Sequence, residues 1–108
     1  MPNHESLAGA LEMVVLKALV RGANHGFGIT LHVQTASKGL LHVEEGSLYP
    51  ALHRMEKAGL VRAEWRTTEN GRRARYYSLT AAGRRRLAAA EQSWATLAKG
   101  VALLLRST

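Results

Sequence analysis

The chain has 108 residues, a length typical of one domain, and 46% of them are apolar, as in an ordinary globular protein. It has no cysteine, which excludes disulfides, thiolate metal sites and cysteine nucleophiles. Its 15 Lys and Arg residues against 8 Asp and Glu residues give a net charge of +7, which favours a polyanionic partner. No apolar run near the N-terminus is long enough for a secretory signal or a membrane span, so we expect a cytoplasmic protein.

Two helices are predicted in the first third of the chain. Apolar residues at positions 7, 11, 14, 15 and 19 follow the helical period and predict a helix over residues 8–21, closed by Gly22. A second helix is expected over residues 27–37. No strand precedes the HGFG stretch at residues 25–28, as a dinucleotide-binding loop requires, so we interpret it as the entry to this helix. The inward residues of the second helix are expected to be Ile29, Val33 and Ala36.

The third predicted helix covers residues 47–58, within the stretch GSLYPALHRMEKAGL. Ser47 is placed as its N-cap, so that Pro50 falls in the first turn, where a missing amide proton breaks no helical hydrogen bond. Gly59 is expected to end the helix. Three apolar residues at helical spacing form its inward stripe: Leu48, Leu52 and Met55.

After the third helix the apolar period changes from helical spacing to strict alternation, which indicates strands. Val61, Ala63 and Trp65 alternate with charged residues and predict a strand with one apolar face. Asn70-Gly71 is a strong hairpin-turn signal, and a second strand is expected over residues 74–79, with Tyr76 packed inward. The tip of this hairpin is basic, since it carries Arg72, Arg73 and Arg75.

Thr80 can cap the last helix, which is expected over residues 81–105. Apolar residues repeat along it at seven-residue spacing, over roughly 37 Å. This stripe is longer than the preceding body can cover, so we expect the helix to pair with a second copy of the chain. The expected dimer interface consists of Leu87, Ala90, Trp94, Leu97, Val101 and Leu104.

Positive charge is concentrated in one third of the chain. Ten of the basic residues and three of the acids lie between Arg54 and Arg86, so this segment carries the whole net charge. A solvated basic face is the simplest interpretation. The element order favours another, because three helices followed by a hairpin form the winged helix-turn-helix, an α+β, mostly α fold whose later helix enters the DNA major groove. We therefore expect a DNA-binding domain over residues 1–80 and a dimerisation helix over residues 81–108.

The predicted DNA contacts lie on the outer side of the third helix and at the hairpin tip. Tyr49 and His53 are four residues apart, on the face that can meet base edges, whereas Ser47 and the first-turn amides can bind phosphate. A wing arginine can enter a minor groove or can contact phosphates alone, and both interpretations stay open. The full predicted set is Ser47, Tyr49, Pro50, His53, Arg54, Lys57, Arg72, Arg73 and Arg75.

Four stretches, HGFGI, GSLYPALHRMEKAGLV, AEW and GRRARYYSLT, give the chain a resemblance to the PadR family of bacterial winged helix-turn-helix transcriptional regulators, over residues 7–97. The resemblance implies a homodimeric repressor that places the third helix and the wing on a palindromic double-stranded operator. The chain is similar to the short subfamily, in which a single C-terminal helix mediates dimerisation. One departure is Phe27, which stands where the family often has tyrosine and offers no hydroxyl to a phosphate.

Trp94 has two interpretations. It lies within the heptad pattern, so it can be a packing residue of the dimer interface. Some short PadR-like regulators of multidrug transport hold planar drugs between such tryptophans, and the similarity of EQSWATL to that arrangement implies a flat aromatic effector beside Trp94.

An enzyme is not expected. The absence of Cys and Asp leaves poor material for nucleophilic or carboxylate-pair chemistry, and the histidines lack metal-ligand spacing, so we expect no catalytic residue, no metal and no cofactor. Two other binding functions remain as alternatives. A membrane-surface adaptor is disfavoured because the last helix carries its arginines, residues 84–86, at one end only. An RNA-binding adaptor would have to present exposed aromatic residues, such as Tyr77.

Overall fold

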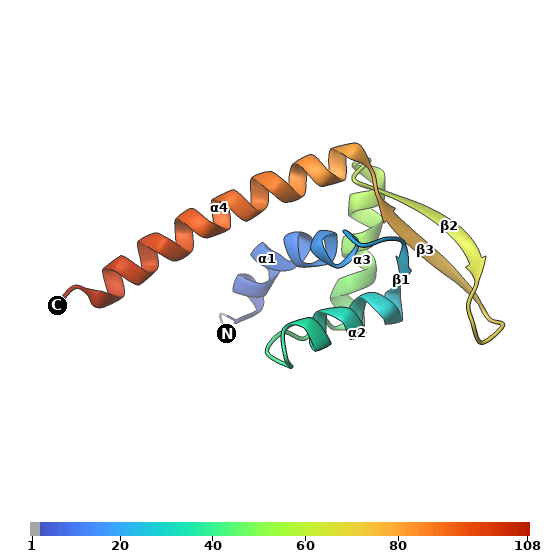
Figure 1. The fold of residues 1–108 in the computed structure, drawn as a ribbon, viewed down its shortest axis with the longest axis horizontal. Coiled ribbons are helices and arrows are strands. Elements are labelled where there is room, and N and C mark those ends of the chain that lie inside the picture. The colour runs from blue at the N-terminus through green and yellow to red at the C-terminus, as the bar shows by residue number, and fades with distance from the viewer. Residues whose placement is uncertain (1–2) are drawn as a thin grey trace.

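The computed structural model describes the backbone of residues 3–108 and the side chains of residues 10–108. Its elements in chain order are α1 (Asn3–Ala18), β1 (Asn24–His25), α2 (Gly26–Ala36), α3 (Glu45–Lys57), β2 (Val61–Thr67), β3 (Arg73–Leu79) and α4 (Ala81–Arg106). Helices α1 to α3 and a small antiparallel sheet form the body of the winged helix-turn-helix that the sequence predicts. The β2–β3 hairpin extends from one end of this body, and α4 leaves it in the opposite direction (Figure 1).

The core is formed where α1, α2 and α3 meet. Its most deeply buried large side chains are Val15, Leu16 and Leu19 from α1 and the turn after it, Ile29 from α2, and Leu48 and Leu52 from α3. Leu7, which the sequence also assigns to this stripe, lies outside the described side chains. The helix α1 ends at Ala18, three residues before the predicted end, and the chain then turns through residues 19–22. The inward stripes of all three helices therefore meet in one apolar centre.

The entry to α2 is built as the HGFG stretch predicts. His25 is the N-cap of α2, and its Nδ1 accepts a hydrogen bond from the Gly28 amide at 3.1 Å. The strand β1 was not predicted, since a strand of two residues shows no alternation. It pairs with β3 through Asn24–Tyr77 and His25–Tyr76, which makes the sheet three-stranded with the order β1-β3-β2. Ala36, predicted to lie inward, is exposed instead, because it is the last residue of α2 and lines an open cavity.

The start of α3 differs from the prediction. The helix begins at Glu45, with Glu44 as an N-cap whose side chain makes no capping hydrogen bond, so Ser47 is the third helical residue and not the cap. Pro50 is consequently inside the helix, past the first turn, and its missing amide leaves the Gly46 carbonyl without a helical donor. Gly46 is exposed, so water can satisfy that carbonyl. Glu45 and Gly46 carry no apolar side chain, and the periodicity therefore gave no sign of them.

The end of α3 is confirmed at Gly59. Gly59 has a φ of 78°, in the left-handed region that glycine adopts without strain. The Gly59 amide donates to the Glu56 carbonyl at 3.0 Å, and the Leu60 amide donates to the Met55 carbonyl at 2.9 Å. These two bonds are the Schellman arrangement, in which Leu60 and Met55, both buried, also approach each other. The turn brings β2 back along α3.

The hairpin forms as predicted, with two corrections to its faces. The register pairs Val61 with Leu79 and Ala63 with Tyr77, so Tyr77 shares the buried face and Tyr76 lies on the other one. The prediction that Tyr76 packs inward was therefore wrong; its ring meets His25 edge-on, with the ring centroids 5.1 Å apart. Trp65 continues the apolar face but is 58% exposed, because the hairpin extends past the body that covers Val61.

The turn of the hairpin is centred on Gly71. The Gly71 amide donates to the Thr68 carbonyl at 2.9 Å, and Gly71 has a φ of 82°, whereas Asn70 does not take a positive φ. This is the three-residue connection in which a type I turn is followed by a left-handed glycine, not the two-residue turn in which both residues have positive φ. The tip is therefore wider than a two-residue turn and leaves Arg72 at the end of the loop.

The junction of the hairpin and α4 is held by Thr80. Thr80 caps α4 as predicted: its Oγ1 accepts from the Gly83 amide at 3.0 Å and donates to the Gly59 carbonyl at 2.6 Å. The Thr80 amide also donates to the Leu60 carbonyl at 3.1 Å. The first turn of α4 is thereby fastened to the turn that ends α3.

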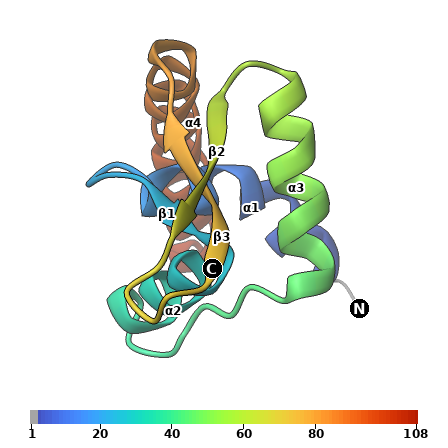
Figure 2. The same ribbon diagram turned by 90° about the vertical axis from the view of Figure 1, so that its right-hand side faces the viewer.

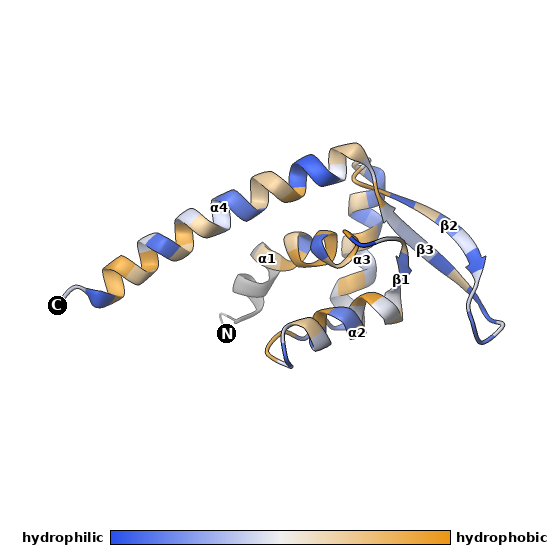
Figure 3. Ribbon diagram, viewed as in Figure 1, coloured by the Kyte–Doolittle hydropathy of each residue, from blue (hydrophilic) through white to orange (hydrophobic). Residues whose placement is uncertain are grey.

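Beyond its first turns α4 runs along α1. Two ion pairs join the two helices, Arg86–Glu12 at 2.7 Å and Lys17–Glu91 at 3.3 Å. Leu87, which the sequence assigns to the dimer interface, is 6% exposed and belongs to the core of its own protomer, because α1 covers it. Apolar residues gather instead in the C-terminal part of α4, past the end of the body (Figure 3).

A substitution at Gly83 tests the contact between α4 and the α3–β2 turn. A Cβ at this position would overlap the Leu60 carbonyl, which is backbone and cannot turn aside. Gly83→Ala is therefore expected to lower the free energy of unfolding by about 2 kcal/mol. The measurement is urea unfolding at one fixed protein concentration.

The matched control is Gly100→Ala, later in the same helix, where a Cβ meets nothing within 4 Å. Alanine there should raise stability by about 0.5–1 kcal/mol through helix propensity. Equal stabilisation by the two substitutions would contradict the close contact at Gly83.

Candidate nucleic-acid interface

The helix α3 separates an apolar side from a polar side. Leu48, Ala51, Leu52 and Met55 are buried against the body, as the predicted stripe requires. The opposite side is exposed and carries the predicted candidates Ser47, Tyr49, Pro50, His53, Arg54 and Lys57. Figure 2 looks onto the end of the molecule where α3 and the hairpin lie next to each other. The two predicted groups of DNA contacts thus lie at the same end of the molecule, with the hairpin tip projecting beyond the body (Figure 1 and Figure 2).

Tyr49 is less available than its sequence position suggests. Its side chain is 47% exposed, yet its hydroxyl lies against Gly26 at the start of α2, where a Cβ would overlap it. Gly26 is buried and has no side chain, which leaves room for the phenol. The ring therefore helps to join α3 to α2. His53, one turn later, is the other predicted base reader and is also exposed.

The arginines of the hairpin differ in their surroundings. The Arg73 guanidinium lies over the Trp65 ring, 5.5 Å from its centroid, and Arg66 lies over Tyr76 at 5.1 Å while pairing with Glu64. Arg72 stands in the exposed loop and, within the described part of the chain, makes no ion pair. The tip thus presents Arg72 and a stacked Arg73 to solvent, an arrangement suited to anions.

Arg75 is directed elsewhere. Its Nη2 is 2.9 Å from Oε2 of Glu56 on α3, although 19 residues separate them in the chain. Tyr77 lies nearby, buried between the hairpin and α3. Burial raises the pKa of the Tyr77 phenol; the Arg75 charge opposes this, and Glu56 and Tyr49 add to it. Sequence reasoning grouped Arg75 with the tip arginines and gave no role to Glu56, because only the fold brings the two together.

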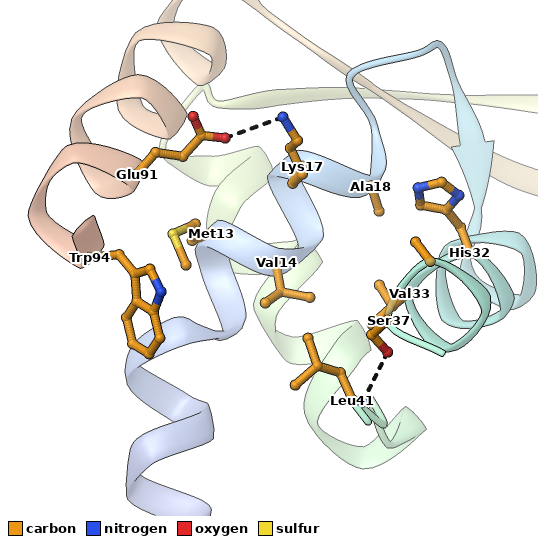
Figure 4. A pocket seen from close by; sticks show the side chains of 11 residues that line it. Met13, Val14, Lys17, Ala18, His32, Val33, Ser37, Leu41, Glu91 and Trp94 are labelled. Carbon is orange, nitrogen blue, oxygen red and sulfur yellow. Dashed lines mark hydrogen bonds and ion pairs between the residues drawn. The ribbon is translucent and has the colours of Figure 1, made fainter. Parts of the chain in front are cut away.

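A separate cavity of about 320 Å³ opens between α1, α2 and α4. Trp94 and His32 stand on opposite sides of it, and the Lys17–Glu91 ion pair lies at one edge (Figure 4). Trp94 is 51% exposed, so its indole also faces solvent. The lining residues are Met13, Val14, Lys17, Ala18, His32, Val33, Ala36, Ser37, Leu41, Glu91 and Trp94.

Of the residues that line this cavity, only Trp94 was predicted from the sequence to contact a ligand. The remaining walls come from α1, α2, the segment after α2 and Glu91 of α4, which are far apart in the chain, so no single window of sequence contains the signal. Among the described residues there is no group of three His, Cys, Asp or Glu residues that could hold a metal ion. The described helices also include none that is long and apolar enough to cross a membrane.

Comparison with known proteins gives consistent results. The model of the transcriptional regulator PadR-like family matches residues 15–89. The transcriptional regulator Rv3488 of Mycobacterium tuberculosis is 35% identical over 92 residues, which cover 85% of this chain and 82% of that protein. The crystal structure of a PadR-like transcriptional regulator from Bacillus cereus aligns with a TM-score of 0.81 at 28% identity and covers 96% of this chain and 99% of that one. A PadR family regulator from Eggerthella lenta aligns with a TM-score of 0.79 at 30% identity, over 97% and 89% of the two chains.

Proposed function

The chain belongs to the PadR-like family of transcriptional regulators, and on this premise we propose that it is a sequence-specific, double-stranded DNA-binding repressor that acts as a homodimer. The observation that carries the proposal is the orientation of α3, whose apolar side chains are buried while His53, Arg54 and Lys57 remain exposed beside the arginine-bearing hairpin. A basic helix face next to a basic wing fits a groove and its flanking phosphates. A protein in this role works in the cytoplasm.

The exposed residues divide by what they can reach. His53 and the outer edge of the Tyr49 ring lie where base edges would be met in the major groove. Ser47, Arg54 and Lys57 are placed to contact phosphates on either side, and Pro50 packs against the sugar-phosphate backbone. At the hairpin tip, Arg72 and Arg73 engage phosphates or enter the adjacent minor groove.

The direct test is selection of bound sequences from a random duplex pool. We expect a palindromic sequence with half-sites roughly 34 Å apart, or a multiple of that, because a two-fold dimer presents two copies of α3. The affinity for the selected duplex should fall steeply with salt as counterions are released. If single-stranded RNA or anionic vesicles compete as well as the duplex at physiological salt, the RNA-binding or membrane-surface alternative would replace this proposal.

Two substitutions on α3 distinguish a contact to base edges from a contact to phosphates. His53→Ala should cost about 1–3 kcal/mol on the selected duplex and little on random DNA, since it removes a base contact. Lys57→Ala should weaken binding to both duplexes and lower the slope of log affinity against log salt by about one. Affinities measured by fluorescence anisotropy over a salt series check both, and an equal loss on the two duplexes for His53→Ala would show that His53 does not read bases.

The proposed dimer uses the part of α4 that the body does not cover. Trp94, Leu97, Val101 and Leu104 are exposed along one stripe, and Leu103 and Leu105 are exposed beside it. So many large apolar side chains on one helix are unusual for a monomer. In this proposal residues 81–108 form the dimerisation helix and residues 1–80 the DNA-binding unit. Ala90 lies at the inner end of the stripe.

A charge placed in this stripe tests the dimer. Leu97→Glu should convert a dimer into monomers of 11.8 kDa, because the carboxylate cannot be buried without a partner. Gln92→Glu adds the same charge at another exposed position of α4 and should leave the dimer intact. Sedimentation velocity at micromolar concentration reports the masses; a wild-type chain that sediments as a monomer would remove the dimer from the proposal.

We further propose that a small planar aromatic effector binds beside Trp94 and releases the repressor from DNA. The cavity supports this, because it is mainly apolar, it is lined by the half-exposed Trp94, and it touches α1 and α2 as well as α4. A ligand shifts DNA affinity only if it binds one arrangement of these helices better than another. A site shared by the helices of the body and the dimerisation helix can provide that difference.

Fluorescence can test the effector, since the chain has two tryptophans and Trp65 is far from this cavity in the sequence and absent from its lining. In a Trp65→Phe variant the emission comes from Trp94 alone. Planar aromatic dyes at micromolar concentration should quench it and should lower operator affinity. Unchanged emission across a broad dye panel would contradict the effector while leaving DNA binding intact.

A further inference from the structure

The hairpin projects well beyond the part of the body that supports it. Its base is held by the buried Val61 and Tyr77 and by pairing of β1 with Tyr76 and Tyr77. Tyr76 is the last residue of β3 that β1 pairs with, and from there to Gly71 in the turn the hairpin extends for roughly 16 Å at about 3.3 Å per residue, with only two strands over this length. A two-stranded ribbon is only marginally stable by itself and twists readily.

The projection makes the position of the tip sensitive to angle. A rotation of about 10° at the base displaces a tip roughly 16 Å away by about 3 Å. That displacement is as large as a hydrogen bond is long, so it would break an arginine–phosphate contact. If α3 and the tip are to engage one duplex together, the hairpin has to be held at a defined angle to α3.

One side-chain contact, between Arg75 of the hairpin and Glu56 of α3, lies where it can hold the hairpin at such an angle. The Arg75–Glu56 pair, at 2.9 Å, is the only ion pair or side-chain hydrogen bond between the hairpin strands and α3 within residues 10–108. Arg75 lies one residue beyond the last position that β1 supports, on the face of β3 that includes the buried Tyr77. Trp65 is its cross-strand partner, and Arg73 stacks on Trp65, so contacts continue from Glu56 toward the tip.

We infer that Arg75 is a positioning residue and not a DNA contact: through Glu56 it holds the wing at a fixed angle to α3, so that both reach the same duplex. This refines the proposed function and rests on it. The sign of the charges distinguishes the two roles of Arg75. A carboxylate near DNA repels phosphate, so simple electrostatics predicts that loss of Glu56 tightens binding. Positioning predicts that the same loss weakens operator binding.

The experiment uses three variants of the full chain, Glu56→Gln, Arg75→Gln and the double variant, on the duplex selected by the wild-type protein and on a random duplex. Both side chains are partly exposed, so loss of the pair can lower operator affinity by at most about a factor of five. Each single variant should lose about three- to fivefold in operator affinity, and the double variant should lose no more than either single one. Random-duplex affinity should not fall for Glu56→Gln, so the operator preference falls.

Salt dependence provides the second measurement. Arg75→Gln should leave the slope of log affinity against log salt unchanged, whereas Arg72→Gln, at the exposed tip, should lower it by about one. Arg106→Gln, at the far end of α4, controls for the loss of one positive charge, and thermal unfolding checks that all variants fold alike.

Tighter or unchanged operator binding by Glu56→Gln, additive losses in the double variant, or a slope lowered by about one for Arg75→Gln would overturn the inference and make Arg75 a phosphate contact. A wild-type chain that prefers no duplex sequence would instead remove the proposed function, and the inference with it. The two failures are therefore distinguishable.

Discussion

The structure depends on the burial of one side of α3. Leu48, Leu52 and Met55 fill the space left by α1 and α2, and the helical period then fixes the direction of every other residue on α3. His53 and Lys57 are exposed because their neighbours in the period are buried. The apolar core thus sets the geometry of the polar surface, and a polar substitution in the stripe would disturb both.

A second constraint is the turn that ends α3. Gly59 reverses the chain, and the carbonyls of Gly59 and Leu60 accept hydrogen bonds from Thr80 at the start of α4. The helix proposed to bind DNA and the helix proposed to dimerise therefore meet at one fastened point, where Gly83 allows close approach.

The basic residues of the chain differ in their contacts, so they are not equally available to a partner. The net charge of +7 is concentrated around α3, the hairpin and the first turns of α4, but the arginines of this region make different contacts. Arg72 faces solvent, Arg73 stacks on Trp65, Arg75 binds Glu56, and Arg86 binds Glu12 of α1. A count of basic residues thus indicates the class of partner, whereas contacts within the fold decide which side chains remain for it.

The sequence by itself determined the order of the four helices and of the two hairpin strands, the fold class and the buried side of α3, because these follow from local period and turns that a single window contains. The family followed from the resemblance of four sequence motifs. Only the tertiary structure decided that Tyr77 and not Tyr76 is buried, that Leu87 belongs to the core, and that Arg75 pairs with Glu56. Each of these depends on strand register or on segments distant in the chain. The start of α3 escaped detection for a local reason, since Glu45 and Gly46 add helix without adding an apolar side chain.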